Sequence, residues 1–205
     1  TKGKKVTHFL SPSPYYTEKI ASAFDVDPSQ DGLFINSGYP RNDALLEPSE
    51  EKTAEFKKSL GIPEGAKVIL YTPTWRDNEY QNGHGFQYES PVNLGKLMEL
   101  LPENYILLFR AHHQVGTSET DRIFDVTDAD DLNDLYLISD LMITDYSSTM
   151  FDYSVLKRPM VFHMYDLERY EREIRGFYFD LDELPGPITK TEEELAEAIR
   201  DGITN

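Results

Sequence analysis

The sequence predicts an α/β fold in which a parallel β-sheet is covered by helices on both faces. Segments with strand character alternate with segments of helical character along the chain, which is the pattern of parallel sheets with crossover helices. Several strand segments, such as Val68–Tyr71 and Ile106–Phe109, are nearly continuous apolar runs, as expected for strands buried on both faces. With 205 residues and 39% hydrophobic content, the chain can build one substantial domain with its own core.

The first part of the chain is expected to form two short strands and two helices. A Ser/Pro loop follows the first strand and leads into a helix that runs to about Ala23. The second strand leads into the loop Gly38–Asp43, and the second helix ends at Gly61, since glycine commonly terminates helices. The expected bounds are Val6–Leu10 and Leu33–Asn36 for the strands and Pro48–Leu60 for the second helix.

The alternation continues through the rest of the chain. The polar segment Asn78–Tyr88 is rich in Gly and Asn and is expected to be a mobile loop. Ser90-Pro91 is expected to cap a helix that runs to about Leu101, with proline at its first position. Thr191–Glu194 has the capping-box pattern of a last helix, which Gly202 closes. The other expected elements are the strands Lys67–Tyr71, Tyr105–Phe109, Leu141–Ile143 and Pro159–Phe162 and the helices Asp131–Ile138 and Thr149–Leu156.

The charge of the chain restricts its partners. Twenty Lys and Arg residues against 37 Asp and Glu residues give a net charge of −17, which argues against a nucleic-acid polymer as partner. One small anionic ligand in a local basic pocket stays compatible with this charge. The sequence has no cysteine and no visible signal peptide. Its longest apolar run is well short of the about 18 residues that a membrane-spanning helix needs. Its abrupt start at Thr1–Lys5, directly before a strand, is what we expect of a piece of a longer protein.

Cationic and hydroxyl side chains follow three of the predicted strands. In open parallel sheets, ligands bind beyond the carboxyl ends of the strands, so these residues are expected to share one ligand-binding edge. Arginine can neutralise a diphosphate through bidentate hydrogen bonds, and a histidine beside it can add a further charge. The three runs are Thr72-Pro73-Thr74-Trp75-Arg76, Arg110-Ala111-His112-His113 and Thr144-Asp145-Tyr146-Ser147-Ser148.

The stretch Ser139–Ser148 is the most concentrated of these groups, because it joins a buried strand to the start of a helix. The first turn of a helix carries unpaired N–H groups and partial positive charge, and it therefore suits a phosphate. Ser147 or Ser148 could instead simply cap the helix. Capping explains one serine but leaves the rest of the cluster unexplained.

Several other kinds of site are disfavoured. The adjacent pair His112-His113 lacks a third ligand at a helpful spacing, so a zinc site is not expected. The sequence contains no G-x-G-x-x-G fingerprint and no P-loop, which argues against a dinucleotide or ATP held in those ways. Ser147 is not in a G-x-S-x-G nucleophile elbow, which argues against a hydrolase. We therefore expect neither a metal nor a cofactor.

Taken in order, a set of motifs resembles the CDP-glycerol glycerophosphotransferases of teichoic acid synthesis. The resemblance covers nearly the whole chain, and the combination of motifs is specific although each alone is weak. The motifs are Gly38–Asp43, Tyr71–Arg76, Arg110–His112, Ser139–Ser148, Phe151-Asp152, Lys157–Pro159 and Arg175–Asp180.

The resemblance implies a GT-B-type enzyme with two Rossmann-like halves. Residues 1–205 would form a single donor-binding domain, mainly the C-terminal half, while the N-terminal half with the acceptor site and the membrane-binding surface would be absent. Such enzymes transfer glycerol phosphate from CDP-glycerol to a hydroxyl of a lipid-linked polyol phosphate acceptor and release CMP. The full-length enzyme would be cytoplasmic and peripheral on the inner face of the cell membrane.

The resemblance also implies roles for individual residues. Arg110 and His112 would face the donor phosphates, and a protonated His112 could stabilise the leaving CMP as the catalytic residue. The remaining substrate-binding residues would hold the phosphates or the ribose and cytosine end, or add donor-side contacts: Arg41, Thr74, Arg76, Thr144, Asp145, Ser147 and Ser148.

One departure from the family pattern concerns the catalytic base. The family carries a His-Gly-Thr-Pro-Leu-Lys motif just upstream of the point where this chain begins, and neither His8 nor Gly3–Lys5 supplies it. The chain alone could therefore bind the donor without turning it over. Two alternatives stay open: a nucleotide-sugar glycosyltransferase or epimerase-type domain, which would prefer UDP or GDP, and a non-catalytic nucleotide-binding module. The sequence also leaves open whether the donor carries glycerol or ribitol.

Overall fold

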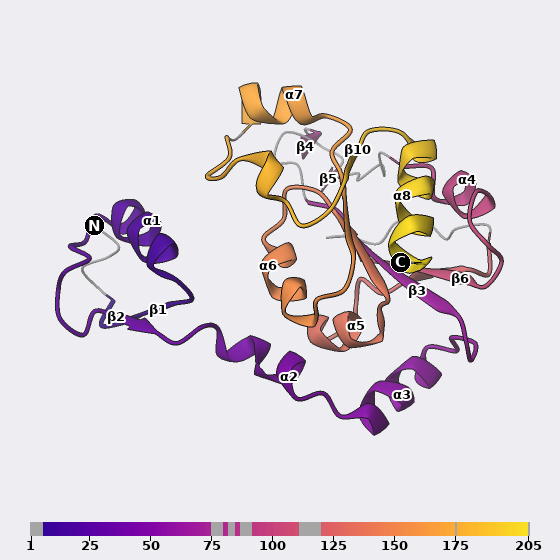
Figure 1. Cartoon of the computed structure of the whole chain (residues 1–205), viewed down its shortest axis with the longest axis horizontal. Coiled ribbons are helices and arrows are strands. Elements are labelled where there is room, and N and C mark those ends of the chain that lie inside the picture. Colours follow the sequence, from indigo (N-terminus) through magenta and orange to yellow (C-terminus); the bar gives the residue numbers. More distant parts are fainter. Residues whose placement is uncertain are drawn as a thin grey trace. The chain divides into compact units, whose positions relative to one another are not determined.

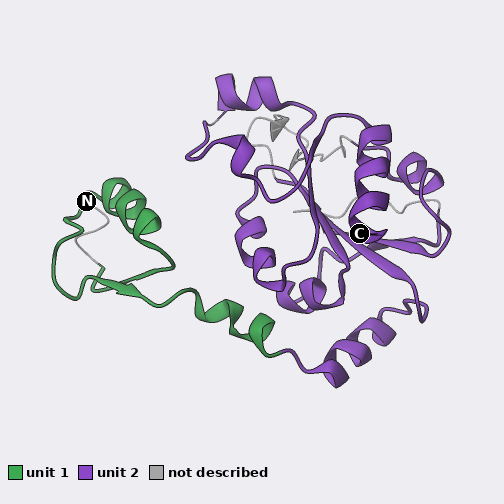
Figure 2. Ribbon diagram, viewed as in Figure 1, with its two compact units in different colours: residues 1–47 green, residues 48–205 purple. Residues whose placement is uncertain are grey.

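The structure is a computed structural model. In it the chain divides into two compact units, Thr1–Glu47 and Pro48–Asn205 (Figure 2). The structure describes residues 6–74, 80–81, 85–86, 92–110, 120–174 and 176–204. The larger unit holds the main sheet and the strand ends at which the sequence predicts a ligand.

The smaller unit is a parallel strand pair with one helix. Phe9 stacks on Phe34 across the strand pair at 5.2 Å between ring centroids, and Phe24 of the helix meets Phe9 edge-on at 5.2 Å. The Ser13 hydroxyl accepts a hydrogen bond from Tyr16 N at 3.2 Å and caps the helix. The elements are β1 (Phe9–Ser11), α1 (Pro14–Phe24) and β2 (Phe34–Asn36). Both strands and the helix are confirmed, but β1 starts at Phe9 rather than Val6, because its partner β2 offers only three residues for pairing.

The prediction of a loop over Gly38–Asp43 is wrong in part. A 3-10 helix, η2 (Pro40–Asn42), occupies its centre and continues into the short helix α2 (Asp43–Leu46). Pro40 stands at the first helical position, where its fixed φ favours a helical turn.

The larger unit is built on a six-stranded parallel sheet, which confirms the predicted fold class (Figure 1). The strand order is β10-β9-β8-β3-β6-β7, so the chain starts at the centre, builds outward to β7 and then returns to build outward on the other side. This is the doubly wound arrangement, and its order reverses between β3 and β8. The strands are β3 (Lys67–Thr72), β6 (Tyr105–Phe109), β7 (Ile123–Asp125), β8 (Leu141–Thr144), β9 (Met160–His163) and β10 (Ile188–Thr189).

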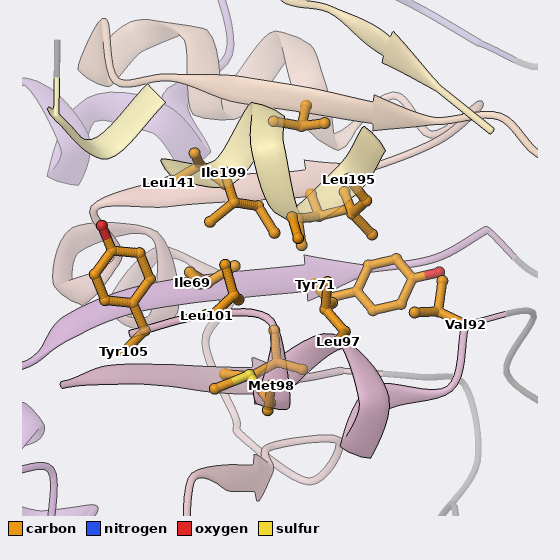
Figure 3. Close-up of a cluster of buried hydrophobic side chains, with 14 of the residues drawn as sticks. Ile69, Tyr71, Val92, Leu97, Met98, Leu101, Tyr105, Leu141, Leu195 and Ile199 are labelled. Carbon is orange, nitrogen blue, oxygen red and sulfur yellow. The ribbon is translucent and has the colours of Figure 1, made fainter. Parts of the chain in front are cut away.

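Helices cover both faces of this sheet. On one face α4 (Leu94–Glu99) and α8 (Glu192–Thr204) pack over the central strands, and their side chains meet Ile69 and Tyr71 of β3 in the main core (Figure 3). On the other side lie α5 (Leu132–Ile138) and α6 (Thr149–Tyr153) (Figure 1). The strands β3, β6 and β8 are almost completely buried, as their apolar runs predict.

The helix expected over Pro48–Leu60 is confirmed as α3 (Glu50–Ser59). Its first turn is capped by Ser49, whose hydroxyl accepts from Lys52 N at 3.3 Å. It ends where Gly61 adopts a φ of +73°, a conformation that glycine adopts without strain.

Other predictions are corrected by the structure. The segment predicted as a loop over Asn78–Tyr88 contains two short antiparallel strands, β4 (Tyr80–Gln81) and β5 (Gly85–Phe86); its other residues lie outside the described ranges. The helix expected to start at Ser90-Pro91 starts at Leu94 instead. Its cap is Asn93, whose Oδ1 accepts from Lys96 N at 3.0 Å, so an amide side chain takes the role predicted for a serine.

The last helix begins as predicted and ends later. Thr191 Oγ1 accepts from Glu194 N at 3.2 Å, and Glu194 Oε2 accepts from Thr191 N at 3.3 Å, which confirms the capping box. Gly202 does not close α8, which continues to Thr204. A Cβ at Gly202 would lie 2.9 Å from Leu141 Cδ1 and 3.2 Å from Pro159 Cβ, so glycine there permits close packing rather than termination.

The sequence did not predict the short elements between the main strands and helices. These are β7, β10, α7 (Leu167–Arg169), the π-helix η4 (Tyr170–Ile174) and η5 (Leu181–Glu183). The helix expected over Thr149–Leu156 is confirmed as α6, which continues into the 3-10 helix η3 (Ser154–Leu156). None of the helices in the described ranges combines the length and the apolar character that crossing a bilayer would need.

Candidate functional site

The candidate site lies where the strand order of the main sheet reverses, at the carboxyl ends of β3 and β8. These strands are neighbours, and their last residues, Thr72 and Thr144, are register partners. In doubly wound sheets the crevice beyond this reversal is the place where ligands bind. The structure therefore brings together two of the three polar runs that follow strands in the sequence.

Asp145 joins the segments that follow β3 and β8 at this expected crevice. Its Oδ1 accepts hydrogen bonds from Thr74 N at 2.9 Å and from Tyr146 N at 2.7 Å, and only 4% of the residue is exposed. A buried carboxylate with two backbone donors holds the chain leaving β3 against the chain leaving β8. This geometry gives Asp145 a structural role at the base of the crevice, while its contact with a substrate stays a prediction.

The threonine hydroxyls beside Asp145 are buried. Thr144 Oγ1 donates to Thr72 O at 3.0 Å and lies 3.4 Å from Thr149 Oγ1 at the start of α6. Within the described ranges, the buried Thr72 Oγ1 has no hydrogen-bond partner. Thr144 therefore ties β8 to β3 and to α6, which places it below the surface of the crevice.

The two serines of this turn have different positions. Ser147 precedes the N-cap position of α6, which Ser148 occupies, and its Oγ accepts from Thr149 N, the first N–H of the helix, at 3.3 Å. Ser148 is exposed, and its side chain makes no capping hydrogen bond. Ser148 is thus the hydroxyl of this turn that faces solvent.

Arg110 lies at the same edge, directly after β6. Its backbone N donates to Tyr71 O at 3.0 Å, and its Nη1 donates to Ala129 O at 2.9 Å. A guanidinium has five N–H donors, so this bond orients the half-buried side chain and leaves donors for an anion. The positive charge next to the β3 and β8 ends is the feature that a diphosphate would need.

Three further predicted site residues, Arg41, Arg76 and His112, are not located relative to this edge. Arg76 and His112 lie outside the described residues. Arg41 belongs to the smaller unit, where its guanidinium carbon lies 3.9 Å from the centre of the Tyr39 ring. In the part of the chain that the structure describes, no group of three or more His, Asp or Glu side chains is arranged to hold a metal ion.

An aromatic cluster beside the crevice was missed by the sequence reasoning. Tyr146 stacks on Tyr170 with a centroid distance of 3.6 Å and an angle of 9°, and Phe177 lies 5.9 Å from Tyr146 and 5.7 Å from Tyr170. The Tyr146 hydroxyl donates to Asp166 Oδ1 at 2.9 Å. The only available signal was the aromatic content of the two motifs that carry Tyr146 and Phe177.

A buried histidine stands at the end of the neighbouring strand β9. His163 is 3% exposed, and its Nδ1 lies 3.1 Å from Thr189 Oγ1. Burial lowers the pKa of this imidazole, and the nearby carboxylates of Glu192, Glu194 and Asp166 oppose that shift. Burial is the largest of these effects, so the folded protein disfavours the charged form of His163.

Comparison with known proteins places the site in context. The family described as CDP-glycerol:poly(glycerophosphate) glycerophosphotransferase matches residues 2–205. The chain is 43% identical to a teichoic acid glycerol-phosphate transferase of Staphylococcus aureus over 94% of its length. It is 40% identical to a teichoic acid poly(glycerol phosphate) polymerase of Bacillus spizizenii over 97% of its length. It covers 50% and 51% of these two proteins, so it spans about half the length of the curated relatives it matches.

Solved structures of the wall teichoic acid polymerase TagF are similar in fold. One TagF variant matches with a TM-score of 0.86 and 36% identity, covering 98% of this chain and 50% of the TagF chain. A TagF variant soaked with CDPG for 30 minutes matches with a TM-score of 0.84 and 36% identity over 98% of this chain and 49% of its own.

Proposed function

This chain belongs to the CDP-glycerol:poly(glycerophosphate) glycerophosphotransferase family, and we propose that it carries the donor site of a CDP-glycerol glycerophosphotransferase. The reaction is transfer of glycerol phosphate from CDP-glycerol to a hydroxyl of a lipid-linked teichoic acid acceptor, with release of CMP. The observation that carries this proposal is the convergence of Arg110 and the Asp145–Ser148 turn at the reversal point of a doubly wound sheet.

The donor is proposed to lie across the carboxyl ends of β3, β6 and β8. Arg110 neutralises the diphosphate, and Ser148, with the backbone of the same turn, accepts and donates hydrogen bonds to the phosphates or the ribose. Asp145 and Thr144 keep the two sides of the crevice in register. Thr74 and Ser147 are proposed as further substrate-binding residues at this edge. Arg41 and Arg76 are proposed as additional contacts with the donor.

The chemistry is a phosphoryl transfer. The acceptor hydroxyl oxygen attacks the phosphorus that carries glycerol, the bond from that phosphorus to the bridging oxygen breaks, and CMP leaves with the electron pair. Positioning and neutralisation of charge supply most of the catalysis in such reactions. His112, protonated beside the two phosphates, is proposed to stabilise the leaving CMP. The base that takes the proton of the acceptor hydroxyl is proposed to come from a part of the protein outside these 205 residues.

The acceptor and the membrane are also proposed to bind the part of the protein outside these 205 residues. The relatives act on teichoic acid by name, and we propose a lipid-linked polyol phosphate acceptor, used on the inner, cytoplasmic face of the cell membrane. The net charge of −17 would be repelled by the anionic lipid surface, which supports membrane contact elsewhere in the protein. The same charge disfavours nucleic acid as a partner.

Calorimetric titration of the 205-residue chain with CDP-glycerol, CDP-ribitol, CMP, UDP-glucose and GMP tests the proposal. Binding of CDP-glycerol and CMP, weakened at least about tenfold by Arg110→Ala, is the expected result. Arg200→Ala is the matched control, because Arg200 donates to Leu100 O near the opposite edge of the sheet and should leave affinity unchanged. Preference for UDP-glucose or GMP would overturn the proposal in favour of a nucleotide-sugar enzyme.

A further inference from the structure

The chain after β9 contacts the candidate site at Tyr146. Residues 166–174 follow β9, the strand next to β8, and so leave the sheet at the same edge, and Phe177 lies further along the same segment. From this segment Tyr170 stacks flat on the Tyr146 ring, Phe177 lies against both rings, and Asp166 accepts the Tyr146 hydroxyl hydrogen bond. Tyr146 therefore has a ring partner on one side and a carboxylate partner at its tip.

The backbone of Tyr146 belongs to the crevice itself. Its N–H donates to Asp145 Oδ1, the same oxygen that accepts from Thr74 N. Tyr146 directly precedes Ser147 and Ser148. Any rotation of the Tyr146 backbone would consequently move the two serines and disturb the bond between the β3 and β8 ends.

The segment that holds Tyr146 has an unusual backbone. Tyr170 opens a π-helix, Tyr170–Ile174, and is itself 7% exposed, so it forms a fixed surface under the Tyr146 ring. Tyr170 N also donates to Asp166 O at 2.9 Å, which joins the two residues that contact Tyr146. π-helical turns are rare and frequently occur at functional sites.

We propose that Tyr146 is a positioning residue for the donor, and that Asp166, Tyr170 and Phe177 act through it. In this proposal, which rests on the proposed function, the stack with Tyr170 fixes the Asp145–Ser148 turn before the donor arrives. The hydroxyl and N–H groups of that turn then meet the diphosphate of CDP-glycerol without having to be ordered first. A site ordered in advance binds more tightly because less conformational freedom is lost on binding.

The test is titration of the 205-residue chain and its variants with CDP-glycerol. Tyr146→Leu removes the stacked ring and is expected to weaken binding about tenfold, while Tyr146→Phe keeps the ring and is expected to stay within about threefold of the original. Tyr170→Leu removes the other ring and leaves Tyr146 in place, so it tests the same stack if the first variant does not fold. Its expected loss is also about tenfold.

Two control variants distinguish a loss of affinity caused by misplacing the Asp145–Ser148 turn from one caused by lower stability or by any change near Phe177. Tyr178→Leu changes the neighbouring ring directly after Phe177, a residue that is 74% exposed at position 178, and it should leave affinity unchanged. Arg158→Ala removes hydrogen bonds at the C-terminal end of α5 and should lower the melting temperature without changing the affinity of the folded protein.

The outcomes distinguish this inference from the proposed function. If the unchanged chain fails to bind CDP-glycerol, the proposed function and the inference fall together. If it binds, and both leucine variants bind as tightly, only the positioning role is overturned. Equal loss of affinity in Arg158→Ala and Tyr146→Leu would also overturn it, because the effect would then follow stability alone.

Discussion

Asp145 Oδ1 lies 2.9 Å from the backbone nitrogen of Thr74 and bridges the point at which the strand order of the sheet reverses. Backbone N–H groups beyond the last paired residues of two strands lose their ladder partners and need other acceptors. One buried carboxylate satisfies two of them, since Tyr146 N donates to the same oxygen. Asp145 thus ties together the segments that follow β3 and β8.

Asp145→Ala is expected to destabilise the protein by about 1–3 kcal/mol, because two N–H donors near the crevice base lose their acceptor. Asp145→Asn keeps an oxygen acceptor at nearly the same place and should lose clearly less. Urea unfolding followed by fluorescence of Trp75 or by circular dichroism gives both free energies of unfolding. Equal losses in the two variants would show that the negative charge, and not the acceptor, holds the two strands together.

Arg158 is expected to be a stabilising residue, although the motif that contains it supported the family resemblance. Its Nη1 donates to Tyr136 O at 3.1 Å, Leu137 O at 2.8 Å and Ser139 O at 2.6 Å, at the C-terminal end of α5. Arg158→Ala should lower the free energy of unfolding by about 2 kcal/mol, because carbonyls at a helix end lose a charged donor. Arg158→Lys should recover part of this loss in the same urea titration. A wild-type unfolding midpoint for Arg158→Ala would refute the assignment.

The main sheet could be predicted because its central strands are buried on both faces and therefore carry unbroken apolar runs. β7 was missed because Ile123 and Phe124 are only partly buried and Asp125 is exposed, so the strand has no such run. β10 has two residues, too few for any period. Short edge strands of this kind are defined by the neighbour they pair with rather than by their own sequence.

The candidate site was predicted only where the rule applies that ligands bind beyond the carboxyl ends of parallel strands. That rule identified Arg110 and Asp145, because both directly follow buried strands. It could not assign them partners, since the acceptor of Arg110 is a carbonyl in the turn after β7, a strand that the sequence did not reveal. The stack of Tyr146 on Tyr170 joins residues from two different strand–loop units, and no periodicity links such positions.

His163 predicts a dependence of stability on pH. Burial lowers the pKa of its imidazole in the folded state below the ordinary value of about 6.5, so protons bind more readily to the unfolded chain. Stability is therefore complete above about pH 6.5 and falls as the pH drops from there toward the folded-state pKa. Free energies of unfolding at pH 7.5 and 5.5 measure this loss.

Removing the imidazole separates its contribution to the loss of stability on acidification from the contribution of the many carboxylates. His163→Gln should show a smaller loss of stability between pH 7.5 and 5.5 than the unchanged protein. His8→Gln, the same chemical change at an exposed histidine, is measured beside it as the matched control. If His163→Gln loses as much stability on acidification as the unchanged chain, the buried imidazole is not the group that titrates.

Gly202 provides a test of how closely α8 packs on the sheet. An alanine in a helix is normally about 1 kcal/mol more favourable than glycine. Here its Cβ would lie 2.9 Å from Leu141 Cδ1 and 3.2 Å from Pro159 Cβ, so one of these side chains or the helix must shift. Overpacking of this kind typically costs about 1–3 kcal/mol, which exceeds the gain in helix propensity.

Gly202→Ala is consequently expected to lower the free energy of unfolding, whereas Gly95→Ala is expected to leave it unchanged or raise it. Gly95 is also helical, in α4, but the nearest atom to its added Cβ would be Asn93 Oδ1 at 3.4 Å, an ordinary contact. Because the chemical change is the same in both variants, the difference between their urea midpoints reports the packing at Gly202 alone. A stabilised Gly202→Ala would mean that α8 can move away from Leu141 at no cost, and that the glycine is not needed for close approach.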